Sequence, residues 1–379
     1  MDIWIKKLAE NPLEAKVVPE SVSGMTRLFT LLFCLFAGVF LAATELDFSF
    51  QARAFGAYEA GNETAFLQGD FLPELNISQN LGKDIGLMGE YSGYAFINGV
   101  FGDSTDTELG LQNYRAWLRI GNPQTALRIG LQRLNFGSAR VLRPLQWFDK
   151  LDPLDKSEFT EGVWALLATH TWLNNSNLWI WGMLGDEDLK GSETNPGKEG
   201  SLELGTRIQL PNPAGETGLA YHQRQAKQGD EYRAGFDHRW DGFVGAWLEG
   251  SVSMTETSDN NADSMATALT VGIDYTFPWG NGVAITAENL FGHQAKTEKT
   301  RLHITEHSLA LLFSYPLGLL DTVTLLEIHS FVSDTDNLSL IWRRAYDYLA
   351  WELGLSLDRG FEAKLSKNPG FFVKLSYNL

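Results

Sequence analysis

The sequence predicts an all-β protein: a transmembrane antiparallel up-and-down β-barrel of 16–18 strands, preceded by a signal peptide. Three observations carry this prediction. Apolar and polar residues alternate along most of the chain, in segments of about ten residues. Turn-forming sequences and longer polar loops separate these segments. The one strongly apolar run lies near the N-terminus and is too short to cross a membrane as a helix.

The composition excludes several classes of protein. The chain has 379 residues, a net charge of −17 and a single cysteine, Cys34. After residue 44 there is no uncharged apolar run of about 18 residues, which argues against a helical transporter. The negative charge argues against nucleic acid as a partner. With one cysteine there can be neither a disulfide framework nor a cysteine-ligated zinc site. We expect no cofactor.

The apolar run Leu28–Ala43 has the length of the hydrophobic region of a signal peptide. Arg27 precedes it, and small residues suited to signal peptidase end it. We therefore expect residues 1–43 to form a signal-peptide region, with Met25 as the true translation start. Residues 44–379 would then form the barrel. A buried core helix is the alternative, disfavoured because the run is terminal and the pattern changes after it.

Five segments show the alternation most clearly: 46–54, 113–120, 202–210, 269–277 and 349–356. In each, apolar residues occupy one face and polar residues, several of them charged, the other. A soluble sandwich turns its apolar face inward, whereas an outer-membrane barrel turns it to lipid and its charges to a wet lumen. The lengths suit tilted strands that cross a bilayer. No change of composition marks a second domain.

Counting the segments gives an even-numbered barrel. Strands are expected to start near residues 46, 70, 84, 109, 125, 163, 177, 202, 216, 231, 243, 265, 282, 303, 322, 338, 348 and 370. Short turns are expected at 121–123, 174–176, 211–215 and 280–282, and long loops at 102–108, 136–162, 186–201, 255–263 and 292–301. Short turns that alternate with long loops indicate the periplasmic and external ends of a bacterial barrel. A barrel this wide encloses a channel or a plug.

Charged residues on the polar faces predict a constriction inside the barrel. Arg115 and Arg119 share the polar face of one segment, and Arg128 lies on that of the next. The loop that follows is acidic. We predict that the constriction involves Arg115, Arg119, Arg128, Arg133, Asp149, Asp152 and Asp155. Arginine stays charged and makes forked contacts with carboxylates. Two roles remain open: the ion pairs pin the loop, or they pin it and also select solutes by charge.

The remaining lumen positions carry both signs of charge. By parity they are Arg53, Glu90, Arg207, Arg233, Asp237, Arg239, Glu249, Asp274, Glu288 and Glu352. Such a lining argues against a lumen dedicated to a polyanion. Trp117 and Trp247 also have lumen parity and could form a carbohydrate-stacking track. Aromatic girdles at the two membrane interfaces are expected to contain Trp172, Trp179, Trp181, Trp240, Trp279, Tyr315 and Tyr377.

The last nine residues resemble the C-terminal assembly signal of bacterial outer-membrane proteins. Phe371, Val373, Leu375, Tyr377 and Leu379 fall on one face of this terminal segment. The usual last residue is Phe or Trp, whereas this chain ends in Leu379. The resemblance implies the barrel-assembly machinery as a partner.

A second resemblance covers some 40 residues. Residues 128–138, with Gly130, Gln132, Phe136 and Gly137, are followed by a loop rich in Pro and Asp. This pattern resembles porin-like barrels of the alginate-export and related uncharacterised families. It implies a transport barrel. The mixed charges of the lumen depart from an alginate exporter, so the resemblance assigns no substrate.

The motif His303-Ile304-Thr305-Glu306-His307 matches the inverted zinc-peptidase pattern. That chemistry needs a helix, but the residues that follow alternate as in a strand. In a strand the two histidines lie about 13 Å apart, too far for one zinc ion. We expect neither a metal site nor catalytic residues, because no histidine lies in a motif with a nucleophile.

These expectations combine into a channel of the Gram-negative cell outer membrane for passive diffusion of small hydrophilic or charged solutes. The partners would be membrane lipid, lipopolysaccharide and the solutes, and a homotrimer is an open alternative to a monomer. The alternative function is a structural or export-associated barrel with a plugged lumen. A hydrolase at the barrel rim is the weaker rival.

Overall fold

The computed structural model describes residues 45–60, 63–102, 105–149, 151, 160, 162–256, 264–296, 304–359 and 368–379. The expected signal-peptide region 1–43, with Met25, lies outside these residues. None of the described residues belongs to a helix long and apolar enough to cross a membrane.

The described chain forms 18 strands in one sheet. The first nine are β1 (Glu45–Glu59), β2 (Thr64–Gly82), β3 (Ile85–Phe101), β4 (Thr105–Gly121), β5 (Thr125–Gln132), β6 (Val163–Thr171), β7 (Asn177–Leu184), β8 (Leu202–Asn212) and β9 (Gly215–Ala226). The others are β10 (Gly229–Asp241), β11 (Gly245–Glu256), β12 (Ser264–Phe277), β13 (Val283–Lys296), β14 (Ile304–Pro316), β15 (Asp321–Ser330), β16 (Thr335–Ala345), β17 (Leu349–Arg359) and β18 (Asn368–Asn378).

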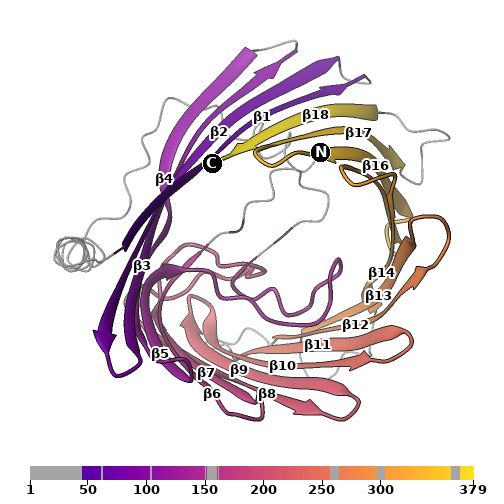
Figure 1. The fold of residues 1–379 in the computed structure, drawn as a ribbon. Coiled ribbons are helices and arrows are strands. Elements are labelled where there is room, and N and C mark those ends of the chain that lie inside the picture. Colours follow the sequence, from indigo (N-terminus) through magenta and orange to yellow (C-terminus); the bar gives the residue numbers. More distant parts are fainter. Residues whose placement is uncertain are drawn as a thin grey trace.

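The sheet closes on itself. Each strand pairs antiparallel with its neighbour in sequence, and β1 pairs antiparallel with β18, with Ala54 opposite Leu375. The backbone N–H of Leu379 donates to the carbonyl of Phe50 at 3.0 Å, and that of Phe50 donates to the carbonyl of Leu379 at 3.1 Å. The ring of strands in Figure 1 therefore has no open edge, which a lipid environment requires. The predicted barrel and its strand number are confirmed.

The two ends of the barrel differ, as expected. At one end, the short-turn end, connections such as 122–124 and 213–214 are brief. At the other, the long-loop end, the chain leaves the wall for residues 133–149 and 185–201. The loops expected at 102–108 and 292–301 are wrong in their extent, because β4 already begins at Thr105 and β13 continues to Lys296.

The outer surface is apolar. Large apolar side chains are exposed at alternate positions in the middle of neighbouring strands, among them Leu166, Ile180, Leu204, Tyr221 and Leu269. The intervening positions carry buried charged residues that face the lumen, such as Arg207 and Glu249. This is the pattern of a barrel embedded in lipid.

The aromatic girdle is only partly as expected. Trp172, Trp240, Trp279 and Tyr377 are exposed near strand ends at the short-turn end. Trp179 and Trp181 are the exceptions, and their assignment to the girdle is wrong. Ile180 between them faces outward, so the pleat turns both indole rings toward the lumen.

Candidate functional site: the lumen and its inward segments

Residues 133–149 lie inside the barrel, and we call them the lumen segment. β5 ends early, at Gln132, and the chain then runs along the inner side of the wall (Figure 1). Arg115 on β4 holds the far end of the same loop, because its guanidinium donates to the backbone oxygen of Thr160 at 2.9 Å and to its hydroxyl at 3.0 Å.

A carboxylate on β11 holds the first turn of the lumen segment. Glu249 is fully buried, and it accepts the backbone N–H groups of Ser138 at 2.7 Å, Ala139 at 2.8 Å and Leu145 at 2.9 Å. Gly137 allows the close approach. Its φ is +110°, and a Cβ there would collide with the carboxylate of Glu249.

A second carboxylate, on β13, holds the next turn. Glu288 is 1% exposed, and it accepts the backbone N–H groups of Arg140 at 2.6 Å, Val141 at 2.9 Å and Leu142 at 2.6 Å. The indole N–H of Trp247 donates to it at 3.0 Å. Four donors compensate a buried charge that would otherwise be very unfavourable.

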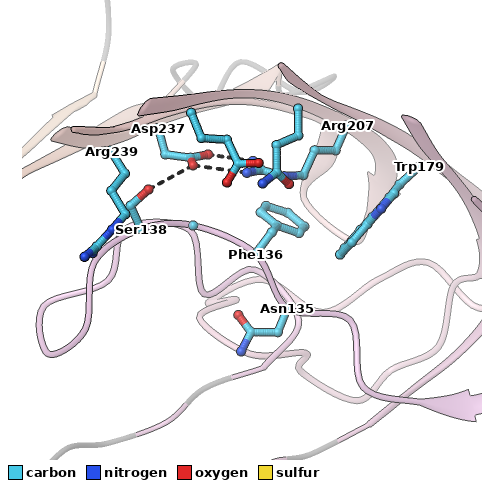
Figure 2. A pocket seen from close by; sticks show the side chains of 10 residues that line it. Asn135, Phe136, Ser138, Trp179, Arg207, Asp237 and Arg239 are labelled. Atoms are coloured by element: carbon cyan, nitrogen blue, oxygen red, sulfur yellow. Dashed lines mark hydrogen bonds and ion pairs between the residues drawn. The ribbon is translucent and has the colours of Figure 1, made fainter. Parts of the chain in front are cut away.

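Charged side chains of the wall complete the attachment. Asp237 on β10 binds Arg207 on β8 through two contacts of 2.6 and 3.1 Å, and it accepts the hydroxyl of Ser138 at 3.1 Å. Figure 2 shows this group beneath the wall strands. Arg140 reaches Asp274 on β12 at 2.5 Å. The polar contacts of the lumen segment thus bind it to the wall from β10 to β13.

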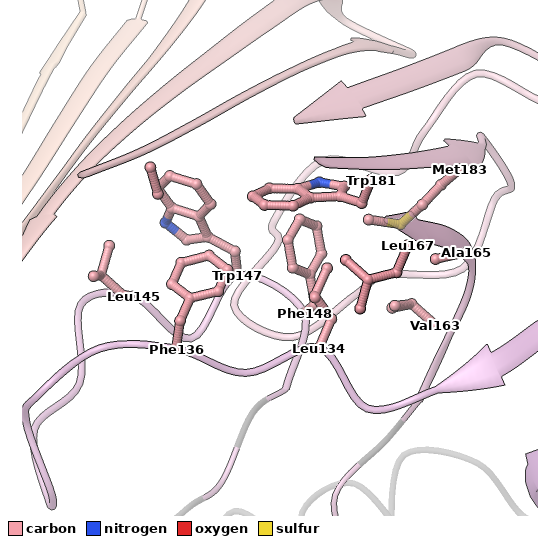
Figure 3. Packing of buried hydrophobic residues seen from close by; sticks show 11 residues of the cluster. Leu134, Phe136, Leu145, Trp147, Phe148, Val163, Ala165, Leu167, Trp181 and Met183 are labelled. Carbon is pink, nitrogen blue, oxygen red and sulfur yellow. The ribbon is translucent and has the colours of Figure 1, made fainter. Parts of the chain in front are cut away.

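Two groups of apolar contacts hold the lumen segment against the wall. Figure 3 shows the rings of Phe136, Trp147, Phe148 and Trp181 gathered into one cluster with Leu134, Leu145 and the β6 side chains Val163, Ala165 and Leu167. The indole N–H of Trp147 also donates to Ser251 at 3.0 Å. Further along, Val141 packs against Ala310 on β14 and Leu326 on β15.

The predicted constriction residues divide into two sets. Arg115 and Arg133 brace the loop: Arg115 holds Thr160, and Arg133 binds the buried Asp149 at 2.5 Å. Asp152 and Asp155 lie outside the described residues. Of the predicted acidic residues, Asp149 therefore pairs with one of the predicted arginines, Arg133.

Arg119 and Arg128 form the second set and lie on the open wall. They are directly opposite each other in the β4–β5 register. The guanidinium of Arg128 lies 4.4 Å from the ring of Trp117, whose N–H donates to Glu90 at 3.0 Å. Both arginine side chains are half-buried. Neither has an ion pair with a carboxylate in the described part of the chain.

Trp247 is not available as a sugar-stacking surface. It is 1% exposed, and the guanidinium groups of Arg140 and Arg239 lie 5.2 and 5.4 Å from the centre of its ring. Its role is structural, as a donor to Glu288.

Residues 185–201 form a second inward segment, which touches the first where Ser192 donates its backbone N–H to Gln146 at 2.9 Å. Arg224 on β9, whose side chain is fully buried, holds this segment. It contacts Glu193 at 2.9 Å, Glu231 at 2.9 Å and the carbonyl of Asn195 at 2.7 Å.

Lys190 adds a second buried ion pair to residues 185–201. It contacts Asp186 at 2.9 Å and the fully buried Glu203 on β8 at 3.2 Å. Burial opposes the charged form, but Glu203 and Asp186 outweigh it and raise the pKa of Lys190. The lysine therefore stays cationic.

A cavity of about 290 Å³ lies between the lumen segment and strands β7–β10. Phe136 and Asn135 contribute from the lumen segment, and Trp179, Gln209 and Arg239 from the wall. In Figure 2, Trp179 and Arg239 stand on opposite sides of it, with Phe136 between them. Gln209 and Arg239 are near the ends of their strands, so the cavity lies on the short-turn side of the lumen segment.

The predicted assembly signal lies in β18 and the residue after it, Leu379, at the seam of the barrel. Its five side chains, Phe371, Val373, Leu375, Tyr377 and Leu379, are all exposed on the outer surface. The alternate residue Lys374 is buried, as expected for a lumen position. Reading by the assembly machinery remains a prediction.

The zinc-peptidase-like motif falls in a strand. Ile304 to His307 belong to β14, and His303 lies outside the described residues. The ring of His307 stacks between Phe291 at 4.6 Å and Phe331 at 4.2 Å. Within the described ranges, no group of three or more His, Cys, Asp or Glu side chains is arranged to hold a metal ion.

Sequence reasoning placed Glu249, Glu288, Asp237 and Arg207 in the lumen but did not identify them as anchors of a loop. Parity gives the face of a strand, whereas the partner of a side chain depends on the path of a distant segment. The signal that could have been used is the presence of two mid-strand glutamates on nearby strands, which need donors if they are buried.

Comparisons with known proteins give a match of fold. No family model matches the chain, and no curated protein matches its sequence. Among solved structures, it is similar to Pseudomonas aeruginosa OccK5 (OpdH), with a TM-score of 0.59 and 12% identity over 89% of this chain and 98% of that one. It is also similar to Pseudomonas aeruginosa OpdK with vanillate, with a TM-score of 0.61 and 10% identity over 89% and 99% of the two chains.

A doubly substituted variant of OccD1 (OprD) gives a TM-score of 0.60 at 10% identity, over 89% of this chain and 96% of that one. Another of these structures, Pseudomonas aeruginosa OpdK, is described as an outer-membrane protein. The fold is therefore that of outer-membrane porins, and the predicted integral barrel is confirmed at this level. The specific resemblance to alginate-export-like families is not tested by these similarities.

Proposed function

We propose that the protein is a channel of the outer membrane for passive diffusion of small hydrophilic or charged solutes. One observation carries the proposal: a closed barrel whose charged interior holds a segment fixed by two buried carboxylates, Glu249 and Glu288. Because this segment is fixed to the wall, it narrows the water-filled lumen whether or not a solute is present. Selection by charge and size is the expected result. Passive diffusion through such a channel requires no chemical reaction.

Arg119 and Arg128 support a selective wall. Like charges directly opposite each other destabilise a sheet, so their pairing has a cost that an anion-attracting role would explain. With Arg115, Arg133, Asp149, Asp152 and Asp155 they complete the proposed constriction. The proposed partners are lipopolysaccharide, the barrel-assembly machinery and, as an alternative to a monomer, two further copies of the chain. From the resemblance to alginate-export-like families we infer only a transport barrel and no substrate.

The experiment is single-channel conductance in a planar bilayer with a salt gradient. Removing both guanidinium groups in R119A/R128A removes about 1 kcal/mol of attraction per charge for an anion passing at ~4 Å. The anion-to-cation permeability ratio should therefore fall about fivefold or more, with the reversal potential moving toward cations.

The control is R343A/R344A, which removes two charges from β16. It should change the reversal potential less. An unchanged reversal potential in R119A/R128A would remove the constriction argument. A correctly folded barrel without any conductance would contradict the channel and favour a plugged structural or export-associated barrel.

A further inference from the structure

The cavity beside the lumen segment contains polar groups that the protein leaves without partners. The indole N–H of Trp179, the amide of Gln209 and the carboxylate of Glu216 all line it. Among the described residues none of these three side chains has a hydrogen bond or ion pair. All three are half-buried. A ligand that displaces water from this cavity has to form hydrogen bonds with these groups in its place.

The arginines of the cavity are already committed. Arg207 is bound twice by Asp237, and Arg239 contacts Asp241 at 2.8 Å and Asp274 at 3.6 Å. An anionic solute would find no guanidinium without a carboxylate beside it. It would also meet the unpaired charge of Glu216. The cavity therefore disfavours anions.

The free groups form a mixed set of donors and acceptors around an aromatic ring. Trp179 offers one donor, Gln209 two donors and an acceptor, and Glu216 acceptors only. The oxygen of Asn135 accepts from Arg143, which leaves its amide nitrogen for a ligand. Hydroxyl groups both donate and accept, so neighbouring hydroxyls on one ring can satisfy such a set.

We propose that this cavity is a binding subsite for a neutral monosaccharide, whose ring lies against Trp179 and whose hydroxyls bind Gln209 and Glu216. Its volume of about 290 Å³ is at the lower end for small-molecule sites, which suits one sugar ring rather than a chain. The proposal rests on the proposed channel function, for which it names a class of solute. It places the subsite on the short-turn side of the lumen segment.

The test is calorimetric titration of the protein, purified from outer membranes in detergent, with methyl glucoside and glucuronate. These two probes share a ring and differ in charge. Methyl glucoside should bind at least about tenfold more tightly than glucuronate, whose carboxylate would meet Glu216. W179A should weaken its binding about tenfold. W172A, which removes an exposed tryptophan outside the cavity, should leave the affinity unchanged.

Q209A tests the same site without changing the aromatic packing, so it remains informative if W179A does not fold. Equal or tighter binding of glucuronate would overturn the proposal. So would the absence of methyl glucoside binding, or binding that W179A and Q209A both leave unchanged. Conductance in plain salt separates this test from that of the channel: a silent barrel that binds methyl glucoside supports the subsite alone, and a conducting barrel that binds none supports the channel alone.

Discussion

At the scale of single residues, the feature that decides the interior is the pairing of carboxylates with peptide groups. Glu249 and Glu288 are almost completely buried, yet neither depends on an arginine for its hydrogen bonds. Backbone N–H groups that would otherwise be left without acceptors satisfy both carboxylates. The two sides of each contact therefore stabilise one another, and losing either leaves the other buried without a partner.

Replacing Glu288 by Ala should release the middle of the lumen segment. Three backbone N–H groups and the N–H of Trp247 lose their acceptor, at about 1–3 kcal/mol each while they stay buried. The segment should detach while the barrel stays folded. Hydrogen exchange of a peptide covering residues 138–145 should rise strongly. E352A is the matched control, because Glu352 faces the lumen but contacts Lys374 and Arg343 instead. Equal exchange in both variants would contradict the anchoring role.

At the scale of elements, the strands could be predicted from the sequence. For the inward segments, the sequence predicted their positions along the chain but not their path inside the barrel. All 18 expected strand starts lie within six residues of those observed, with the largest difference at β2. Alternation is a local signal, and it fixes the strand and its faces. The path of a 30-residue loop is set by contacts between residues far apart in sequence, such as Val141 with Ala310 and Leu326. These contacts also explain why Ala310 and Leu326 on the inner wall are apolar. A water-filled lumen alone would predict polar residues at such positions.

Arg224 tests the second inward element. Its guanidinium is fully buried and bound by Glu193 and Glu231, so R224A leaves both carboxylates to Arg233 alone and frees the carbonyl of Asn195. We expect a loss of about 1–3 kcal/mol in the attachment of residues 185–201. Limited proteolysis at Lys190 and Lys198 should report it, with faster cleavage than in the wild type.

R343A is the control for that experiment, because Arg343 is largely exposed and its pair with Glu352 is worth about 0–1 kcal/mol. The pH dependence gives a further check. The pKa of Lys190 is raised, so its contribution is complete at pH values below the ordinary lysine pKa and is lost only as the pH rises through the raised value. Cleavage should therefore stay slow from neutral pH to mildly alkaline pH. If R224A resists proteolysis as well as the wild type does, the attachment of residues 185–201 by Arg224 is contradicted.

At the scale of the whole molecule, closure of β1 on β18 defines where the barrel begins. β1 starts at Glu45, directly after the small residues expected to be cleaved. Mass spectrometry of the outer-membrane form should find an N-terminus near Thr44, because no longer segment is needed to reach the seam between Phe50 and Leu379. Recovery of residues 1–43 on the inserted protein would contradict a signal peptide.

The anchors of the lumen segment have a consequence for how its sequence can change. Glu249 and Glu288 bind peptide N–H groups at residues 138–142 and 145, and every amino acid except proline supplies such a group. Pro144 stands at a position where no N–H is used. These backbone contacts therefore survive an exchange of side chains, whereas the contacts that Ser138, Arg140, Val141 and Leu145 make with the wall do not. Evolution or protein engineering can change the remaining side chains while the two carboxylates keep the backbone in place.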